Sequence, residues 1–242
     1  MILLGFDMET TGLDFQKDRP IEIGYILYST AQKRCLESSG YLVKTDVPIS
    51  PFITKLTGIT QSAVDKFGYE SLDGLELLID AIRTADAIVG QNVNRFDKRM
   101  LGAWGSRHGI AIPEKLWIDT RTDLPGVESK SLSYMAADHG FLNLFPHGAL
   151  TDVQTCLKIV SMYDLDVVAA RAKEPTVVLK AHVGFENNSL AKARKFGWYD
   201  DKKGTKFWYK VVKQSDVAAE TAHGEFDVSF ITDVPVEKLW YS

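Results

Sequence analysis

Phe6-Asp7-Met8-Glu9-Thr10-Thr11-Gly12-Leu13 closes an apolar run that begins at Ile2. The run predicts a buried strand, and the Thr-Thr-Gly turn predicts that the strand ends at the rim of a sheet. Because alternate side chains of a strand share one face, we expect Asp7 and Glu9 to point the same way. Adjacent carboxylates repel, and magnesium or manganese would relieve that repulsion. An isolated Asp-x-Glu pair is more often two solvated acids. A metal site is therefore indicated only if other motifs in the chain point to it as well.

The composition is that of a globular protein and argues against a disulfide-rich scaffold, a cysteine-based zinc protein and a membrane-spanning protein. The chain has 242 residues, of which 45% are hydrophobic, and can form one large domain or one medium and one small domain. Its two cysteines, Cys35 and Cys156, provide neither a disulfide framework nor a paired-cysteine zinc motif, so we expect a reducing, cytoplasmic compartment. No apolar run reaches the ~20 residues of a membrane span, and the first residues are typical of a strand, not of a signal peptide.

The net charge of −4 argues against a nucleic-acid partner when it is taken alone, but it hides an asymmetry. Residues 176–213 hold nine Lys or Arg and three acids, which gives this segment +6 and leaves −10 for the rest. An acidic body with a basic segment suggests a metal-binding catalytic part and a polyanion-binding part.

The order of apolar patterns predicts an α/β fold. Strands at 2–6, 20–28 and 35–44 are joined by short connections, which favours an antiparallel meander, and helices then alternate with strands. We therefore expect a mixed sheet with helices on its faces. The other expected elements are strands at 87–90 and 116–118, a short helix after the N-cap Thr60, a helix capped by Ser71, helices at 94–108, 131–139 and 152–162, and loops at 48–51 and 120–130.

Pro175 marks the expected boundary between a domain of residues 1–170 and a small unit of residues 175–242. The small unit is expected to be an α+β module with βαββ order. Its elements are a strand at 177–183, a helix at 189–196, a hairpin of 198–199 and 207–212, and a later strand at 226–231.

Three further residues stand in contexts that suggest chemistry. Asp97 follows a buried strand and an Asn-bearing turn, in the expected first turn of a helix, where the helix dipole favours an acid. Asp152 opens another expected helix, and His147 lies five residues before it. Taken singly, Asp97 is typical of a helix-start acid and His147 of a surface loop.

Together, these segments are far less easily explained by chance. Asp-x-Glu-Thr-Thr-Gly from Asp7, Phe-Asp at 96–97 and His-x4-Asp from His147 resemble the three motifs of the DEDD exonucleases, in the branch with a histidine (DEDDh, DnaQ-like). The segments 18–24 and 56–60 support the resemblance, which covers residues 1 to about 165. Where many relatives have His-Asn before the second-motif acid, this chain has Asn92-Val93, which puts the contacts around the ligands in doubt but not the ligand.

The resemblance implies a ribonuclease H-like fold and a set of functional residues. It implies that Asp7, Glu9, Asp97 and Asp152 hold two Mg²⁺ or Mn²⁺ ions and that His147 is the general base. It also implies substrate contacts by a second set, namely Met8, Thr10, Thr11, Leu13 and Asn94. Leu13 would pack against the 3′ base or be an ordinary turn hydrophobe. Of the remaining candidates, Cys35 and Cys156 are expected in the core, Asp119 as a cap, and Glu22 as structural.

The basic C-terminal unit interleaves cations with aromatic residues. Aromatic rings can stack on bases while cations hold phosphates, although such a short unit also needs some of the rings for its own core. The pattern resembles an accessory module of some phage and bacterial exonucleases, and we expect it to hold single-stranded nucleic acid. The expected contacts are Lys192, Arg194, Lys195, Trp198, Lys206 and Trp208.

The sequence thus predicts a 3′–5′ exonuclease that acts on DNA 3′ ends, preferentially single-stranded. An exoribonuclease and a polymerase-associated proofreading subunit are alternatives, since the motifs do not read the 2′-hydroxyl and a replication or repair protein could be a partner. A catalytically silent nucleic-acid-binding module is an alternative of a different class, but it would not need all five of the motif residues.

Overall fold

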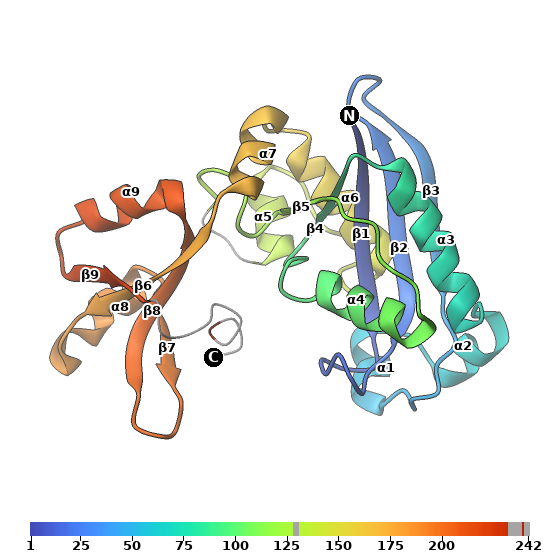
Figure 1. Ribbon diagram of the computed structural model, residues 1–242, viewed down its shortest axis with the longest axis horizontal. Coiled ribbons are helices and arrows are strands. Elements are labelled where there is room, and N and C mark those ends of the chain that lie inside the picture. Colours follow the sequence, from blue (N-terminus) through green and yellow to red (C-terminus); the bar gives the residue numbers. More distant parts are fainter. Residues whose placement is uncertain (128–130, 232–238, 240–242) are drawn as a thin grey trace. The chain divides into compact units, whose positions relative to one another are not determined.

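The first sheet is built around the strand that carries Asp7 and Glu9. The computed structural model describes residues 1–127, 131–231 and 239 (Figure 1). Five strands form the sheet in the order β3-β2-β1-β4-β5. β1 pairs antiparallel with β2 and parallel with β4, so the predicted mixed sheet is confirmed. The strands are β1 (Ile2–Thr10), β2 (Pro20–Ser29), β3 (Arg34–Leu42), β4 (Ala87–Gly90) and β5 (Leu116–Asp119).

Helices cover both faces of this sheet. The helices are α1 (Pro51–Thr57), α2 (Gln61–Phe67), α3 (Ser71–Thr84), α4 (Asp97–His108), α5 (Leu132–Asp138), α6 (Ala149–Val160) and α7 (Leu165–Lys173). α3 and α4 pack on the face that includes Phe6 and Met8, whereas α5 and α6 pack on the face that includes Leu3 (Figure 1). The alternation of β1 therefore sends Asp7 and Glu9 toward the α6 face.

Some element boundaries differ from the predictions. α1 begins at Pro51, where a loop was expected, because Pro51 suits a first turn and the Ser50 hydroxyl accepts a hydrogen bond from the Ile53 N–H. The prediction that Ser71 caps α3 was wrong: Ser71 is already helical, and its hydroxyl accepts a hydrogen bond from Trp104 Nε1 at 2.9 Å. α7 was not predicted. The Thr60 cap of α2 is confirmed.

The two cysteines differ in their exposure to solvent. Cys156 is buried in α6, as expected of a core residue. Cys35 is exposed, which corrects the expectation, because it lies on β3, an edge strand whose early residues face solvent.

The chain divides into two compact units, Met1–Ala172 and Lys173–Ser242. The second has a four-stranded antiparallel sheet in the order β7-β8-β6-β9, and the predicted β-α-β-β order is present. Helix α9 was not predicted. The elements are β6 (Thr176–His182), α8 (Asn188–Ala193), β7 (Gly197–Asp200), β8 (Lys206–Lys213), α9 (Val217–Ala222) and β9 (Asp227–Phe230). The end of the predicted loop, 128–130, and part of the C-terminal tail lie outside the described residues.

Among the described residues, no helix combines the length and the apolar character that crossing a membrane would require.

Candidate active site

Helix α6 lies directly on β1 and β2 because glycines leave room for it. A Cβ atom at Gly5 would come within 2.7 Å of the Val153 and Leu157 side chains of α6. A Cβ atom at Gly24 would come within 2.4 Å of the α6 backbone at Ala149. The close approach brings the start of α6 beside the C-terminal end of β1, where Asp7 and Glu9 lie.

The start of α6 carries the third motif. Asp152 lies in the first turn of α6, and this helix begins at Ala149, three residues earlier than predicted. His147 has a φ of 67°, and this bend turns its backbone N–H to Asp152 Oδ2 at 3.2 Å. Asn143 donates to Asp152 Oδ1 at 2.6 Å, so both carboxylate oxygens fasten the loop that carries His147.

One ligand atom from each of Glu9, His147 and Asp152 lies within 4.8 Å of the others. Such a group of two carboxylate oxygens and an imidazole nitrogen could hold a cation or transfer a proton between them. The sequence places these residues up to 143 positions apart, and the fold brings them together at one end of β1.

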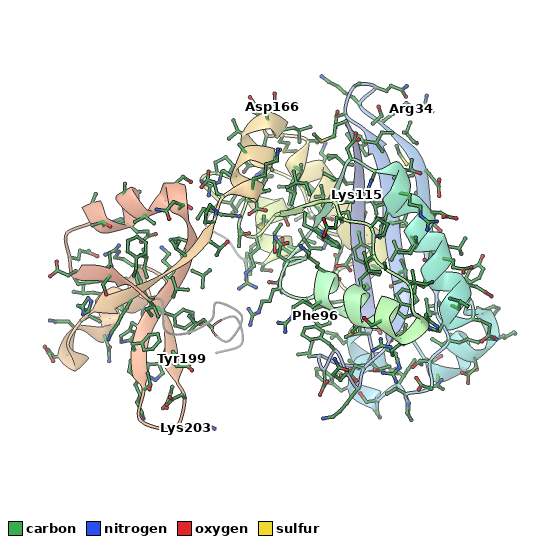
Figure 2. The ribbon with its side chains drawn as sticks, viewed as in Figure 1. Arg34, Phe96, Lys115, Asp166, Tyr199 and Lys203 are labelled. Atoms are coloured by element: carbon green, nitrogen blue, oxygen red, sulfur yellow. The ribbon has the colours of Figure 1, made fainter. Side chains whose placement is uncertain are left out.

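Asp97 reaches the same end of β1 from α4. The loop before α4 is held by buried Asp119, whose carboxylate accepts the N–H groups of Asn92 at 2.8 Å and Asn94 at 3.2 Å. These bonds keep Asn94 out of the helix, which therefore begins at Asp97 and not at 94, directly after Phe96 (Figure 2). The Met8 backbone N–H acts on the Asp97 carboxylate and lowers its pKa, while Asp97 Oδ1 is buried and has no hydrogen-bond partner in the described part of the chain.

Burial and mutual repulsion make these carboxyl groups reluctant to ionise. Burial raises the pKa of Asp7 well above its usual range, and the charges of Asp97, Glu9 and Asp152 raise it further. Burial, then Glu22 and Asp152, raises the pKa of Glu9 to about 8. Burial is also the main cause that raises the pKa of Asp97 and of Asp152.

These environments fit divalent cations. Buried carboxylates that repel one another, together with the unpartnered Asp97 Oδ1, provide hard oxygen atoms of the kind that bind such cations, and a bound cation would compensate their charge. Cations of the magnesium or manganese type provide that compensation better than protons do at neutral pH, because they compensate several carboxylates at once.

Glu22, which is expected to be structural, also lies beside the candidate site. It lies opposite Glu9 in the β1–β2 register, so the two side chains share one face. Its Oε2 accepts the Ala149 N–H at 3.0 Å, which satisfies the first turn of α6 and explains why the helix begins there. An acid in an otherwise apolar strand was the available signal, but only the register shows where it points.

The expected substrate contacts lie around this site with different exposures. The Met8 side chain is buried in the core, so a substrate contact by this residue would have to come from its backbone. The Thr10 hydroxyl donates to the Gly12 carbonyl at 2.6 Å, and the Thr11 hydroxyl donates to Asp18 at 2.9 Å, so both side chains hold the turn. Leu13 is 72% exposed at the same turn, and Asn94 is half-buried in the loop that precedes α4.

Of the cations expected to contact nucleic acid in the second unit, Arg194 does not reach the surface. It is buried, pairs with Glu220 at 3.0 Å and packs against the Phe226 ring at 4.4 Å. Its role is therefore structural, which corrects the expectation. Lys192, Lys195 and Lys206 are exposed.

Residues 4–160 match the model of a protein family described as Exonuclease (RNase_T). The chain is also similar to DNA polymerase III enzymes of the PolC type. It is 34% identical to that of Mycoplasmopsis pulmonis over 115 residues, 48% of this chain and 8% of the relative. It is 32% identical to that of Thermotoga maritima over 159 residues, 63% of this chain and 11% of the relative. The chain thus matches only a small part of these long relatives.

Solved structures share the fold. E. coli ExoI in complex with single-stranded DNA superimposes with a TM-score of 0.63 at 17% identity, over 74% of this chain and 47% of ExoI. The nuclease domain of 3'hExo, described as a DEDDh family member bound to rAMP, gives 0.57 at 20% identity, over 66% of this chain and 90% of that domain. These likenesses confirm the ribonuclease H-like fold predicted from the motifs.

Proposed function

This chain belongs to the exonuclease family (RNase_T), and we propose that it is a DEDDh member that releases nucleotides from the 3′ end of DNA by metal-dependent hydrolysis, with a preference for single strands. The observation that carries this proposal is the gathering of Glu9, His147 and Asp152 within 4.8 Å, beside the buried Asp7 and Asp97. A module that only binds nucleic acid, and does not hydrolyse it, would not require an imidazole beside a carboxylate cluster.

Asp7, Glu9, Asp97 and Asp152 would hold two Mg²⁺ or Mn²⁺ ions. When bound, such a pair supplies positive charge to the attacking and leaving oxygens of an in-line displacement at phosphorus. The chain's own contribution is the fixed arrangement of the carboxylates. Asp152 is held by hydrogen bonds from Asn143 and the His147 N–H, and Asp97 is held by burial, so these carboxylates need little reorganisation.

His147 would accept the proton of the attacking water. Histidine is the side chain that ordinarily exchanges a proton near neutral pH, and an exposed imidazole can pass that proton to solvent after each turnover. The 3.2 Å bond from its backbone to Asp152 fixes the loop while leaving the ring free to face the substrate.

A digestion series tests the proposal. End-labelled single-stranded and double-stranded DNA and RNA are incubated with magnesium, with manganese and with chelator. Stepwise loss from the 3′ end of DNA, abolished by chelator and by Asp7→Ala, is the expected result. Undiminished cleavage by Asp7→Ala would contradict the ligand assignment, and digestion of nothing would favour a silent binding module.

Two observations favour variants of this function. The neighbour 3'hExo is bound to rAMP, which favours RNA as an alternative substrate. The PolC-type relatives are polymerases, which favours a proofreading role beside a replication protein. Digestion of RNA alone in the same series would select the first. Co-purification with a polymerase, together with faster removal of mismatched than of matched 3′ ends, would select the second.

A further inference from the structure

The second unit lies outside residues 4–160, so the family match does not account for it. One face of its sheet carries a buried hydrophobic cluster. Tyr199, Phe207 and Tyr209 gather on that face and pack with Leu239, which is buried. The Tyr209 hydroxyl donates to the Leu239 carbonyl at 2.5 Å, so these aromatic rings belong to the unit's own core.

The opposite face is only partly covered. Its core residues, Leu179, Ala181 and Val212, pack against residues of α8 and α9 and against Phe196. The β7–β8 hairpin, marked by Tyr199 and Lys203 in Figure 2, continues beyond them. Trp198 and Trp208 are directly opposite on this hairpin and therefore lie on the same face, with ring centroids 5.1 Å apart.

The two indoles differ in exposure. Trp208 is half-buried and joins the core, whereas Trp198 is 45% exposed, although tryptophan ordinarily buries most of its large surface. The edge-to-face arrangement, at an interplanar angle of 60°, means that Trp198 is supported by Trp208 without being stacked on it. A supported ring with an open surface is suited to stack on a flat ligand.

Two cations adjoin the pair. Lys192 is exposed, and its Nζ lies 5.9 Å from the centre of the Trp208 ring. Lys206 lies on the same face, two residues from Trp208, with a side chain that is 54% exposed and 2.9 Å from Asp200. A surface ion pair of this kind is weak, so a phosphate can replace Asp200 at little cost. Arg194 and Lys210 cannot serve in this way because both pair with Glu220.

We propose that Lys192, Trp198, Lys206 and Trp208, here called the tryptophan patch, bind single-stranded nucleic acid. A base stacks on the open surface of Trp198, and Lys192 and Lys206 hold phosphates on either side. A duplex is excluded as the preferred ligand because its bases present no free face to an indole. This site does not rest on the proposed hydrolysis, since it would act equally in a chain without nuclease activity.

The test is binding of labelled oligonucleotides of about 20 nucleotides to the full chain in chelator, measured by fluorescence anisotropy. Separate arms use thymidine and uridine homopolymers and a DNA duplex of equal length. We expect Trp198→Ala to weaken single-strand binding at least about fivefold and Trp198→Phe to keep most of it, because a phenyl ring can still stack. The ratio of the two homopolymer affinities shows whether the patch prefers DNA or RNA.

The lysines provide a second, independent measurement. Lys192→Ala combined with Lys206→Ala should lower the slope of log affinity against log salt by about 1.4, the value for two phosphate contacts on a single strand. The matched control is Lys55→Ala combined with Lys158→Ala, which removes the same charge from exposed positions of the first unit. Thermal melting identifies any variant that has failed to fold.

Unchanged affinity and unchanged salt slope in the folded patch variants would overturn the proposal. So would equal loss of duplex and single-strand binding in Trp198→Ala, because stacking cannot explain it. A nuclease that digests normally but shows no patch-dependent binding would reject the tryptophan patch alone. Patch-dependent binding without digestion would reject only the proposed function.

Discussion

Asp7 and Glu9 are an extreme case of carboxyl groups whose surroundings oppose ionisation. They share one face of β1 with Glu22 on β2 beside them, and Asp97 and Asp152 face them from two helices. These acids are held so close together, and so far from water, that their ionised forms are poorly stabilised. His147 is the exception, an exposed base fastened to that set through its backbone.

The first prediction concerns His147. Replacing it with alanine removes the proposed proton acceptor but no core contact, so we expect hydrolysis to slow by roughly 10²–10⁴-fold with little change in thermal stability. The measurement is single-turnover cleavage of a labelled strand. His223→Ala, an exposed histidine of the second unit, is the control and should cleave normally. Equal rates for both variants would remove His147 from the mechanism.

The second prediction concerns Glu22. Glu22→Gln keeps an oxygen for the Ala149 N–H but removes a charge beside Glu9. We expect the metal-free protein to melt at a higher temperature near pH 8 and to require more magnesium for half-maximal cleavage. Glu22→Ala also loses the hydrogen bond. Its free energy of unfolding should therefore be about 1 kcal/mol lower than that of Glu22→Gln, and it should melt at a lower temperature. A Gln variant with wild-type magnesium dependence would restrict Glu22 to holding α6.

At the scale of elements, the position of α6 on the sheet decides whether the third motif meets the first. The contact is possible because Gly24 has no side chain where α6 begins. Glu22 accepts the Ala149 N–H at the start of the same helix, and Asp152 accepts the His147 N–H of the loop before it. Helix placement and site geometry are therefore one property.

The third prediction follows from that contact. Gly24→Ala puts a Cβ atom 2.4 Å from backbone atoms of α6, which cannot be relieved by a rotamer change, so α6 must shift. We expect a loss of about 1–3 kcal/mol in stability and a larger loss of cleavage, measured by chemical denaturation and by digestion. Gly102→Ala, in α4 with nothing within 4 Å of the new Cβ, is the control and should stabilise by about 0.5–1 kcal/mol. Normal cleavage by Gly24→Ala would show that α6 tolerates displacement.

At the scale of the whole molecule, the charge of the site links stability to pH and to metal. Burial and repulsion raise the pKa of Glu9 to about 8 and raise those of Asp7 and Asp97. A carboxyl group with a higher pKa in the folded than in the unfolded state keeps its proton on folding, so its contribution is lost as pH rises.

The fourth prediction is that the metal-free protein loses stability between about pH 5 and pH 8, where the unfolded chain has released protons that the folded site retains. Magnesium should reduce this loss, because it replaces the protons and stabilises only the folded site. The measurement is thermal melting at several pH values, in chelator and in magnesium. Asp7→Asn should flatten the metal-free curve. A wild-type curve that is flat or rises over this range would contradict the assigned environment.

The second unit shows how far a local pattern can be interpreted. Its alternation of cations and aromatic residues predicted both a core and a binding surface, but it could not assign each residue. Arg194 and Trp208 contribute to the core, whereas Trp198 and Lys206 remain at the surface. That division depends on α9, whose Glu220 pairs with Arg194 and which the sequence pattern did not predict.

The sequence by itself determined the family, the mixed sheet and the period that puts Asp7 and Glu9 on one face, because strand alternation and short motifs are local properties. Only the tertiary structure decided that Glu22 lies opposite Glu9, that α4 and α6 begin at Asp97 and Ala149, and that Arg194 is buried. The physical reason is that register, helix starts and burial are fixed by partners distant in the chain. The Glu22 carboxylate that holds Ala149 comes from 127 residues away.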